Sequence, residues 1–257
     1  MYLAIPSQKT CAAAWLSAVT TVDAQQDHEA YNVVIDIADP LKESPSDTVI
    51  IDRVNAFLEA HESPPLQTVA NTIFPYSTYR RHGAPKLYEV YLKSIYPKVK
   101  HHDWGRYFER MINCQTGGKT INPLAELITK LRQHIHGGGN VFHNIYEMSI
   151  YDPALDIRIY DPGRDANRLR NRQCLSFLSF KLNGKKELSV TAVYRNHSYI
   201  ARLLGNMIGL GRLLEFVALE TGAGMGALTI VSTHATVDTD SWRRGELSDL
   251  INACMKI

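Results

Sequence analysis

A cysteine, an asparagine and a histidine follow one another in the last third of the chain, each near the edge of an expected element. Cys174 lies in the alternating run QCLSFLSFKL, which predicts a half-buried strand over 173–182. Asn206 lies near the start of a long apolar helix, and His234 ends a branched, strand-like run. A thiolate can add to an electron-poor ring carbon, and an amide offers both a donor and an acceptor to a ring edge. This order of residues suits covalent chemistry on a heterocyclic ligand.

Each of these residues also has a purely structural explanation when it is taken alone. Cys174 could be a small buried apolar side chain, and Asn206 could cap the helix that follows Gly205. Arg195 could be a solvated strand end, and His234 could bond to backbone at a turn. Only the ordered combination favours the chemical interpretation.

Strand-like and helical patterns alternate along the chain and must position these residues. Helices are expected over 11–20, 47–60, 66–74, 85–95, 122–132 and 199–220, and near the end of the chain. Strands are expected over 31–38, 147–150, 155–160, 173–182, 188–195 and 227–234. Two strands joined by a short turn at Asn183-Gly184 and followed by a long helix predict an α+β domain with a large sheet.

Local signals define several ends of these elements. Asp47 and Asn122 are the expected helix caps, with Pro123 at the first helical position. The segment 79–83 reads as a basic loop, and the glycines of 222–226 read as a helix C-cap and tight turn.

Composition limits the classes of partner. The 257 residues carry a formal net charge of only +2 with 21% charged residues, so no long-range field points to nucleic acid or to an anionic membrane. The four cysteines form no C-x-x-C pair, which favours reduced thiols in a cytoplasmic protein over a disulfide framework. The histidine spacings match no closed zinc pattern, so we expect no metal. The sequence contains no run of about 20 apolar residues of the kind that predicts a membrane span.

Four stretches together resemble the core of the thymidylate synthase family. They are QCLSFLSFKL, LSVTAVYRNHS, LLGNMIGLGRLLEFVALETG and LTIVSTHA, and WGRYFERM upstream resembles a further family segment. The family has Pro-Cys-His in a strand, Tyr-Gln-Arg-Ser at the end of the next, Phe-Asn opening a helix and Gly-Asp-x-His at a strand end. The resemblance covers 104–234 and is weaker over 1–100. It implies a single thymidylate-synthase-like domain over 1–257, with a large mixed sheet packed with helices.

The resemblance also implies roles for individual residues. Cys174 would add to carbon 6 of a uridylate-type pyrimidine nucleotide such as dUMP, so that carbon 5 can take up a methyl or hydroxymethyl group. Asn206 would read the uracil edge, Arg195 would bind phosphate and His234 would bond on the ribose side. The residues expected around the substrate are Trp104, Arg172, Arg195, Ser198, Asn206 and His234. A homodimer and 5,10-methylenetetrahydrofolate as one-carbon donor are implied as well.

The chain departs from the family pattern at several points. Leu175 replaces the family's His after the cysteine, and Thr236 replaces the Tyr that follows its last His. Only a short segment follows His234, where the family continues with a segment that closes over the folate. Two alternatives therefore stay open: another substitution or hydrogen exchange at carbon 5 without folate, and a non-catalytic nucleotide sensor or partner subunit that keeps the fold.

Overall fold

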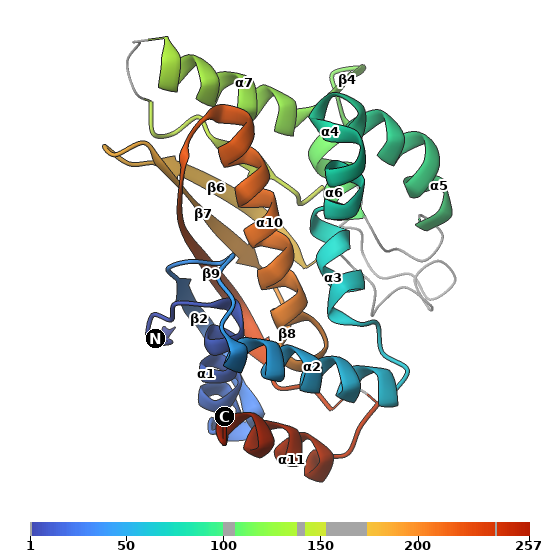
Figure 1. Cartoon of the computed structure of the whole chain (residues 1–257), viewed down its shortest axis with the longest axis vertical. Coiled ribbons are helices and arrows are strands. Elements are labelled where there is room, and N and C mark those ends of the chain that lie inside the picture. Colours follow the sequence, from blue (N-terminus) through green and yellow to red (C-terminus); the bar gives the residue numbers. More distant parts are fainter. Residues whose placement is uncertain (1, 100–105, 138–141, 153–173, 240) are drawn as a thin grey trace.

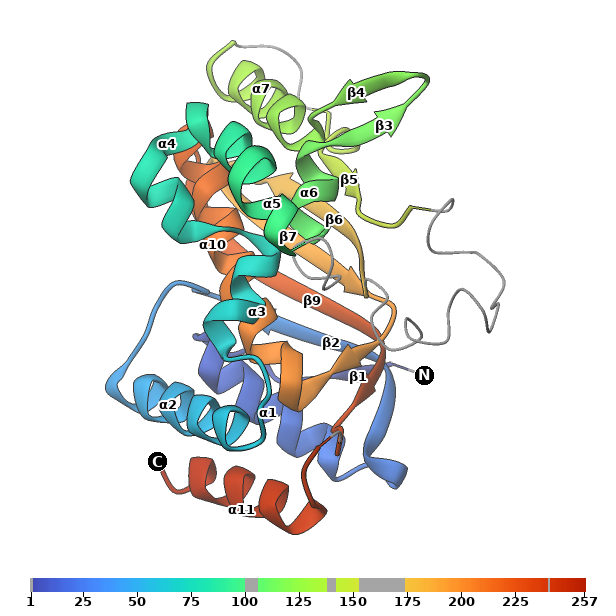
Figure 2. The ribbon, with the colours of Figure 1, turned by 90° about the vertical axis from the view of Figure 1, so that its right-hand side faces the viewer.

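A computed structural model describes residues 2–99, 106–137, 142–152, 174–239 and 241–257. Its centre is a mixed sheet of seven strands in the order β1-β2-β9-β7-β6-β5, in which β8 also pairs with β9 (Figures 1 and 2). The strands are β1 (Leu3–Ala4), β2 (Glu29–Ile37), β5 (Glu147–Ser149), β6 (Leu175–Leu182), β7 (Glu187–Tyr194), β8 (His197–Ser198) and β9 (Gly224–Thr236). A separate hairpin is formed by β3 (Cys114–Thr116) and β4 (Lys119–Ile121).

The strand β9 organises the sheet. It runs antiparallel to β2 on one side and parallel to β7 and then β8 on the other. The hairpin of β6 and β7 is closed by the Asn183 side chain, whose amide oxygen accepts the N–H groups of Lys185 and Glu187, both at 2.9 Å. The buried positions of β7 alternate strictly, as the sequence pattern predicts for a strand with one covered face. The mixed α+β architecture expected from the sequence is confirmed.

Helices α1 (Cys11–Asp23) and α10 (Leu204–Thr221) lie against one face of this sheet. The other described helices are α2 (Pro45–Ala60), α3 (Leu66–Ile73), α4 (Tyr76–Val90), α5 (Tyr96–Val99), α6 (Arg106–Ile112), α7 (Pro123–His136) and α11 (Arg244–Met255). Short stretches of other helical type are η1 (Gln26–His28), η2 (Tyr91–Ile95) and η4 (Tyr199–Leu203). Among the described residues no helix is both long and apolar enough to cross a membrane.

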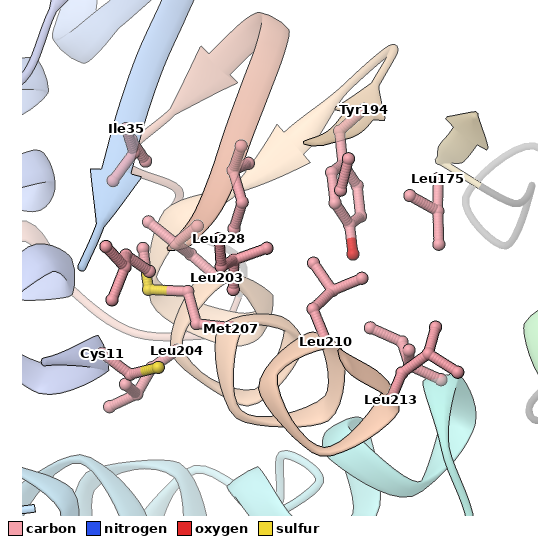
Figure 3. Close-up of a cluster of buried hydrophobic side chains, with 14 of the residues drawn as sticks. Cys11, Ile35, Leu175, Tyr194, Leu203, Leu204, Met207, Leu210, Leu213 and Leu228 are labelled. Atoms are coloured by element: carbon pink, nitrogen blue, oxygen red, sulfur yellow. The ribbon is translucent and has the colours of Figure 1, made fainter. Parts of the chain in front are cut away.

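The helix α10 is apolar almost all round because it is covered on two sides. It lies along β7 and β9 and packs on its other side against α3 (Figures 1 and 2). In Figure 3 Leu203, at the end of η4, and Met207 and Leu210 of α10 point toward Leu228 of β9 and Tyr194 of β7. The sides of α10 that face the sheet and α3 need no polar groups, which explains the long apolar run in the sequence, and Arg212 and Glu215 lie on its partly exposed side.

Two glycines of α10 let α3 approach closely. A Cβ atom added at Gly205 would lie 2.6 Å from Cβ of Val69, and one added at Gly209 would lie 2.7 Å from the carbonyl oxygen of Ala70. These positions are four residues apart and therefore lie on one side of α10. Larger residues at either position would push the two helices apart.

Three local predictions need correction. Ser44, and not Asp47, caps α2; Asp47 is the third helical residue and returns a bond to the Ser44 N–H in a capping box. The segment 79–83 is not a loop, because it continues α4 up to a kink at Gly83, where φ is +71°. Finally, β6 begins at Leu175, so that Cys174 lies immediately before the strand.

Other expectations agree with the structure. Asn122 caps α7 by accepting the Ala125 N–H at 2.9 Å, and Gly222 ends α10 in the left-handed conformation with φ +77°. Helical backbone begins at Tyr199, as expected, first as η4 and then as α10. The strand expected over 155–160 lies outside the described residues.

Candidate functional site

Cys174 is fixed through its backbone on two sides. Its carbonyl oxygen accepts the N–H of Arg195 at 2.9 Å, and its own N–H donates to Oη of Tyr107 in α6 at 2.9 Å. The N–H of Leu175 reaches the same hydroxyl at 3.3 Å. The Cys174 side chain is half-buried and packs against the edge of the core. The thiol therefore has a defined position without being sealed inside the core.

Two neutral phenols neighbour this thiol. Burial raises the pKa of Tyr107 to about 12, and the nearby Cys174 is the second cause of this increase. Arg202 of η4 has a smaller effect that lowers the pKa. Burial also raises the pKa of Tyr194 well above its usual value, with Tyr107 and Cys174 as smaller causes. Both hydroxyl groups therefore keep their protons at neutral pH and can only act as hydrogen-bonding groups there.

The Tyr194 ring connects the cysteine to a second polar group. It lies flat on the imidazole of His197, with ring centroids 3.9 Å apart and planes inclined by 11°. Its hydroxyl is fully buried and has no hydrogen-bond partner among the described residues. In Figure 3 this hydroxyl points toward Leu210 of α10.

Asn206 and His197 form a buried pair. The Asn206 amide nitrogen lies 2.9 Å from Nε2 of His197, and Nδ1 of the same ring lies 3.0 Å from Oγ of Ser232 in β9. Asn206 is 4% exposed and His197 is 1% exposed. Burial lowers the pKa of His197 to about 3, so its ring is neutral. The Asn206 side chain is used inside the fold and does not cap the helix, which excludes the simplest structural explanation of this residue.

The structure thus places Cys174, Arg195 and Asn206 at one end of β7. Arg195 and Cys174 are bonded neighbours, and the row Tyr194, His197 and Asn206 continues from them. The Arg195 guanidinium lies 5.5 Å from the ring centroid of Tyr151.

Ser198 and His234 occupy different surroundings. Oγ of Ser198 is buried and has no hydrogen-bond partner in the part of the chain that the structure describes. His234 lies in β9, where Nδ1 is 2.7 Å from Oδ1 of Asn196 and Nε2 is 3.2 Å from Oε2 of Glu29. Both ring nitrogens of His234 are therefore engaged with protein groups. Trp104 and Arg172 lie outside the described residues.

Sequence reasoning missed several members of this site. They are Tyr107, Tyr194, His197 and Ser232. Tyr107 lies inside the WGRYFERM segment and His197 lies between Arg195 and Ser198, so both were in stretches that carry the family resemblance. A signal for His197 is present only in its neighbours: it follows a buried strand and precedes an apolar helix, where a polar ring needs a partner.

The described residues hold no group of three or more His, Cys, Asp or Glu side chains that could bind a metal ion. Two of the histidines considered from the sequence bond elsewhere: His134 contacts the hydroxyl of Tyr146, and Nε2 of His136 lies 3.0 Å from the carbonyl oxygen of Thr221.

The buried neutral His197 should make the stability of the protein depend on pH. The unfolded chain binds a proton at this ring below its usual pKa of about 6.5, whereas the folded protein does so only near pH 3. The stabilisation is complete above pH 6.5 and is lost as pH falls toward 3, with a slope approaching about 1.4 kcal/mol per pH unit. The free energy of unfolding, measured with urea across this pH range, should depend less steeply on pH in His197→Gln than in wild type. Equal slopes would contradict this expectation.

Comparison with known proteins gives a consistent but distant relationship. No family model matches the chain. The chain is 25% identical over 182 residues to a protein of Methanocaldococcus jannaschii, a match that covers 67% of this chain and 76% of the relative. It is 33% identical to a protein of Methanosarcina mazei and 30% identical to one of Methanosarcina barkeri, each over 69 residues that cover 27% of this chain and 31% of the relative. All three carry the name "Putative thymidylate synthase". The chain is thus similar to a divergent thymidylate-synthase-like family found in several archaea, which confirms the resemblance in its sequence.

Proposed function

We propose that this protein binds a uridylate-type nucleotide and transfers a one-carbon group to carbon 5 of its ring through a covalent adduct of Cys174. One observation carries the proposal: the half-buried Cys174 bonds through its backbone to Arg195, the neighbour of Tyr194, whose ring stacks on His197, the partner of Asn206. The proposed nucleophile, just before β6, and the proposed ring-reading amide, in α10, thus lie near the same end of β7. The names of the archaeal relatives support the same reaction class.

The chemistry follows from the electronic structure of uracil. The Cys174 thiolate adds to carbon 6, the carbon 5–carbon 6 double bond is broken, and its electron pair moves to carbon 5 and oxygen 4 as an enolate. Carbon 5 can then attack an electrophilic one-carbon unit. Loss of the proton from carbon 5 drives the electrons back, restores the double bond and expels the thiolate.

The described side chains suggest how the nucleotide is held. Asn206 uses one amide N–H on His197, which leaves its second N–H and its oxygen for O4 and N3–H of a uracil ring. Arg195 is the proposed phosphate ligand, since its guanidinium presents a fork to phosphate oxygens. The Ser198 hydroxyl has no hydrogen-bond partner among the described residues, and we propose that it binds the phosphate as well. His234 would have to exchange Asn196 or Glu29 for a ribose hydroxyl. Roles for Trp104 and Arg172 remain predictions.

The proposal includes a cytoplasmic homodimer with a thymidylate-synthase-like fold over 1–257. The sheet face opposite α10 supports the dimer. On this face a row of half-exposed apolar side chains crosses four neighbouring strands, from Val34 through Val231 and Val193 to Phe177. A second copy could cover such a row, because apolar surface of this kind favours association.

The one-carbon donor is a separate question. The resemblance points to methylenetetrahydrofolate, and the last described helix, α11, packs on α1 and α2. The adduct experiment with and without this folate identifies the donor.

A non-catalytic nucleotide sensor is the second candidate. It is favoured by His234, whose two ring nitrogens are both engaged within the protein. Such a protein would bind a nucleotide without forming a covalent adduct.

The test is to incubate the protein with 5-fluoro-dUMP, with and without methylenetetrahydrofolate, and to map any adduct by mass spectrometry of peptides. Because fluorine cannot leave carbon 5 as a proton does, the adduct should remain on the peptide that contains Cys174. An adduct only with the folate identifies it as donor. Binding measured by calorimetry without an adduct would favour the sensor, and no binding of any pyrimidine nucleotide would contradict both candidates.

A further inference from the structure

We propose that the hydroxyl group of Tyr107 donates a hydrogen bond to the Cys174 thiolate and so increases the fraction of this cysteine that is ionised at neutral pH. This inference rests on the proposed function, because it names a second residue that acts on the proposed nucleophile. The thiol can be measured without any nucleotide, so the inference and the proposed function can fail independently of each other.

The hydroxyl oxygen of Tyr107 accepts two hydrogen bonds from the main chain. It lies 2.9 Å from the backbone nitrogen of Cys174 and 3.3 Å from that of Leu175. Backbone N–H groups can only donate, so the direction of both bonds is fixed. Successive N–H groups of an extended strand point to opposite sides, so their convergence on one oxygen means that the chain bends at Cys174, just before β6. This bend holds Cys174 against the end of the Tyr107 side chain.

The proton of this hydroxyl is left for a third hydrogen bond. The two N–H groups occupy the lone pairs of the phenol oxygen, and the proton has no acceptor among the described residues. Hydrogen bonds accepted by a hydroxyl oxygen polarise its O–H bond and make the proton a stronger donor. Burial raises the pKa of Tyr107 to about 12, so the phenol keeps this proton at pH values at which a cysteine ionises.

The sulfur atom of Cys174 lies within reach of this proton. In its staggered rotamers a cysteine sulfur is about 3 to 4 Å from its own backbone nitrogen, which is the atom that Tyr107 already contacts. Rotation about the Cα–Cβ bond can therefore turn the sulfur toward the hydroxyl without any movement of the backbone. The two side chains also interact electrostatically, since Cys174 is the second cause, after burial, of the raised pKa of Tyr107.

Ionisation of the thiol makes this hydrogen bond strong. A neutral thiol is a weak acceptor, whereas a hydrogen bond to an ionised group is roughly twice as strong as one between neutral groups. The bond therefore favours the thiolate, whose proton passes to solvent water while the phenol keeps its own. The positive charge of Arg202 reaches the same hydroxyl and also favours a thiolate. Two further neighbours are Arg195, a cation, and Tyr194, which is neutral.

The rate at which iodoacetamide alkylates Cys174, measured by peptide mass spectrometry from about pH 5 to about pH 10, tests this bond. The thiolate displaces iodide, so the rate reports both the thiolate fraction and its nucleophilicity. In Tyr107→Phe the midpoint of the pH profile should move to higher pH. The rate should fall about threefold at neutral pH and rise about threefold at the alkaline end, because a thiolate without its donor is scarcer but more nucleophilic. A purely structural role of Tyr107 would change the rate by one factor at all pH values.

A second variant keeps the two main-chain bonds, because Tyr107→Phe leaves both N–H groups without their acceptor. A tyrosine analogue with one ring fluorine, placed at position 107, retains the oxygen and is a stronger donor, so the midpoint should move to lower pH than in wild type. Tyr79→Phe is the matched control, since the Tyr79 hydroxyl bonds to Glu220 at 3.4 Å. The Cys114 peptide is the internal reference, and its rate should be equal in all four proteins.

Opposite shifts of the midpoint in the two position-107 variants support the inference. An unchanged midpoint in folded Tyr107→Phe overturns it, and so does a midpoint of the fluorinated protein that equals or exceeds that of wild type, whether or not Tyr107→Phe folds. Either result leaves the proposed function standing. The absence of any Cys174 adduct with 5-fluoro-dUMP overturns the proposed function instead and leaves the alkylation result unaffected.

Discussion

Replacing Cys174 by serine is expected to reduce turnover at carbon 5 by a factor of about a thousand or more while leaving nucleotide binding largely intact. A serine hydroxyl is close in size to the thiol, so the backbone bonds from Cys174 to Arg195 and Tyr107 should persist. Its oxygen is a far weaker nucleophile at neutral pH, because almost none of it is ionised. Tritium release from carbon 5 of labelled dUMP measures the turnover, and calorimetry measures the binding.

Cys114→Ser provides the control for this experiment. Cys114 is also a free, half-buried cysteine, but it lies in β3 of the separate hairpin. The other two thiols are buried, and burial raises the pKa of both Cys11 and Cys254 and makes them poor nucleophiles. If Cys114→Ser lost activity as Cys174→Ser does, the assignment of the nucleophile would be wrong. Full activity in Cys174→Ser would exclude covalent catalysis by this residue.

The second large effect is expected from Gly209→Val, which should lower the free energy of unfolding by about 3 kcal/mol or more. Even the first added carbon would lie 2.7 Å from the Ala70 carbonyl oxygen and 3.1 Å from Cβ of Ile73. Backbone atoms cannot turn aside as a flexible side chain can. Valine is a better helix former than glycine by a few tenths of a kcal/mol, which is too little to offset the overlap.

Urea unfolding followed by circular dichroism measures this change. Gly184→Val is the matched control, because a Cβ atom at Gly184 would meet nothing within 4 Å. Since Asn206 lies between Gly205 and Gly209 on α10, displacement of the helix should also weaken nucleotide binding in Gly209→Val. A loss below about 1 kcal/mol would mean that α3 can move away from α10 at little cost.

The periodic segments of the chain were predictable because their burial depends on local spacing. The run 188–195 predicts a strand and the run 199–220 predicts a helix, and the fold covers the same faces that the pattern marks. Asn122 was recognisable as a cap because a cap needs only its own neighbours.

The remaining features depend on partners that are distant in the sequence. His197 becomes neutral and buried only because Ser232 and Asn206 meet it from another strand and from α10. Tyr107 supports Cys174 across 67 positions of the chain. Asp47 could be mistaken for the cap of α2, because Ser44 and Asp47 bond to each other reciprocally and either reads as a helix start.

The position of β9 has a consequence for how the chain is made. This strand separates β2 from β7, so β1 and β2 join the rest of the sheet only through residues 228–236, which are synthesised after the other described strands. Strand pairs that are so distant in the sequence slow folding, because the entropy cost of closing a long loop comes before the stabilising contacts form. Until then β2 has only the two-residue β1 beside it, and its open edge is a hazard for aggregation. Nascent chains stopped before Gly224 should therefore depend on chaperones, and the proposed nucleotide site should form only after β9 has been synthesised.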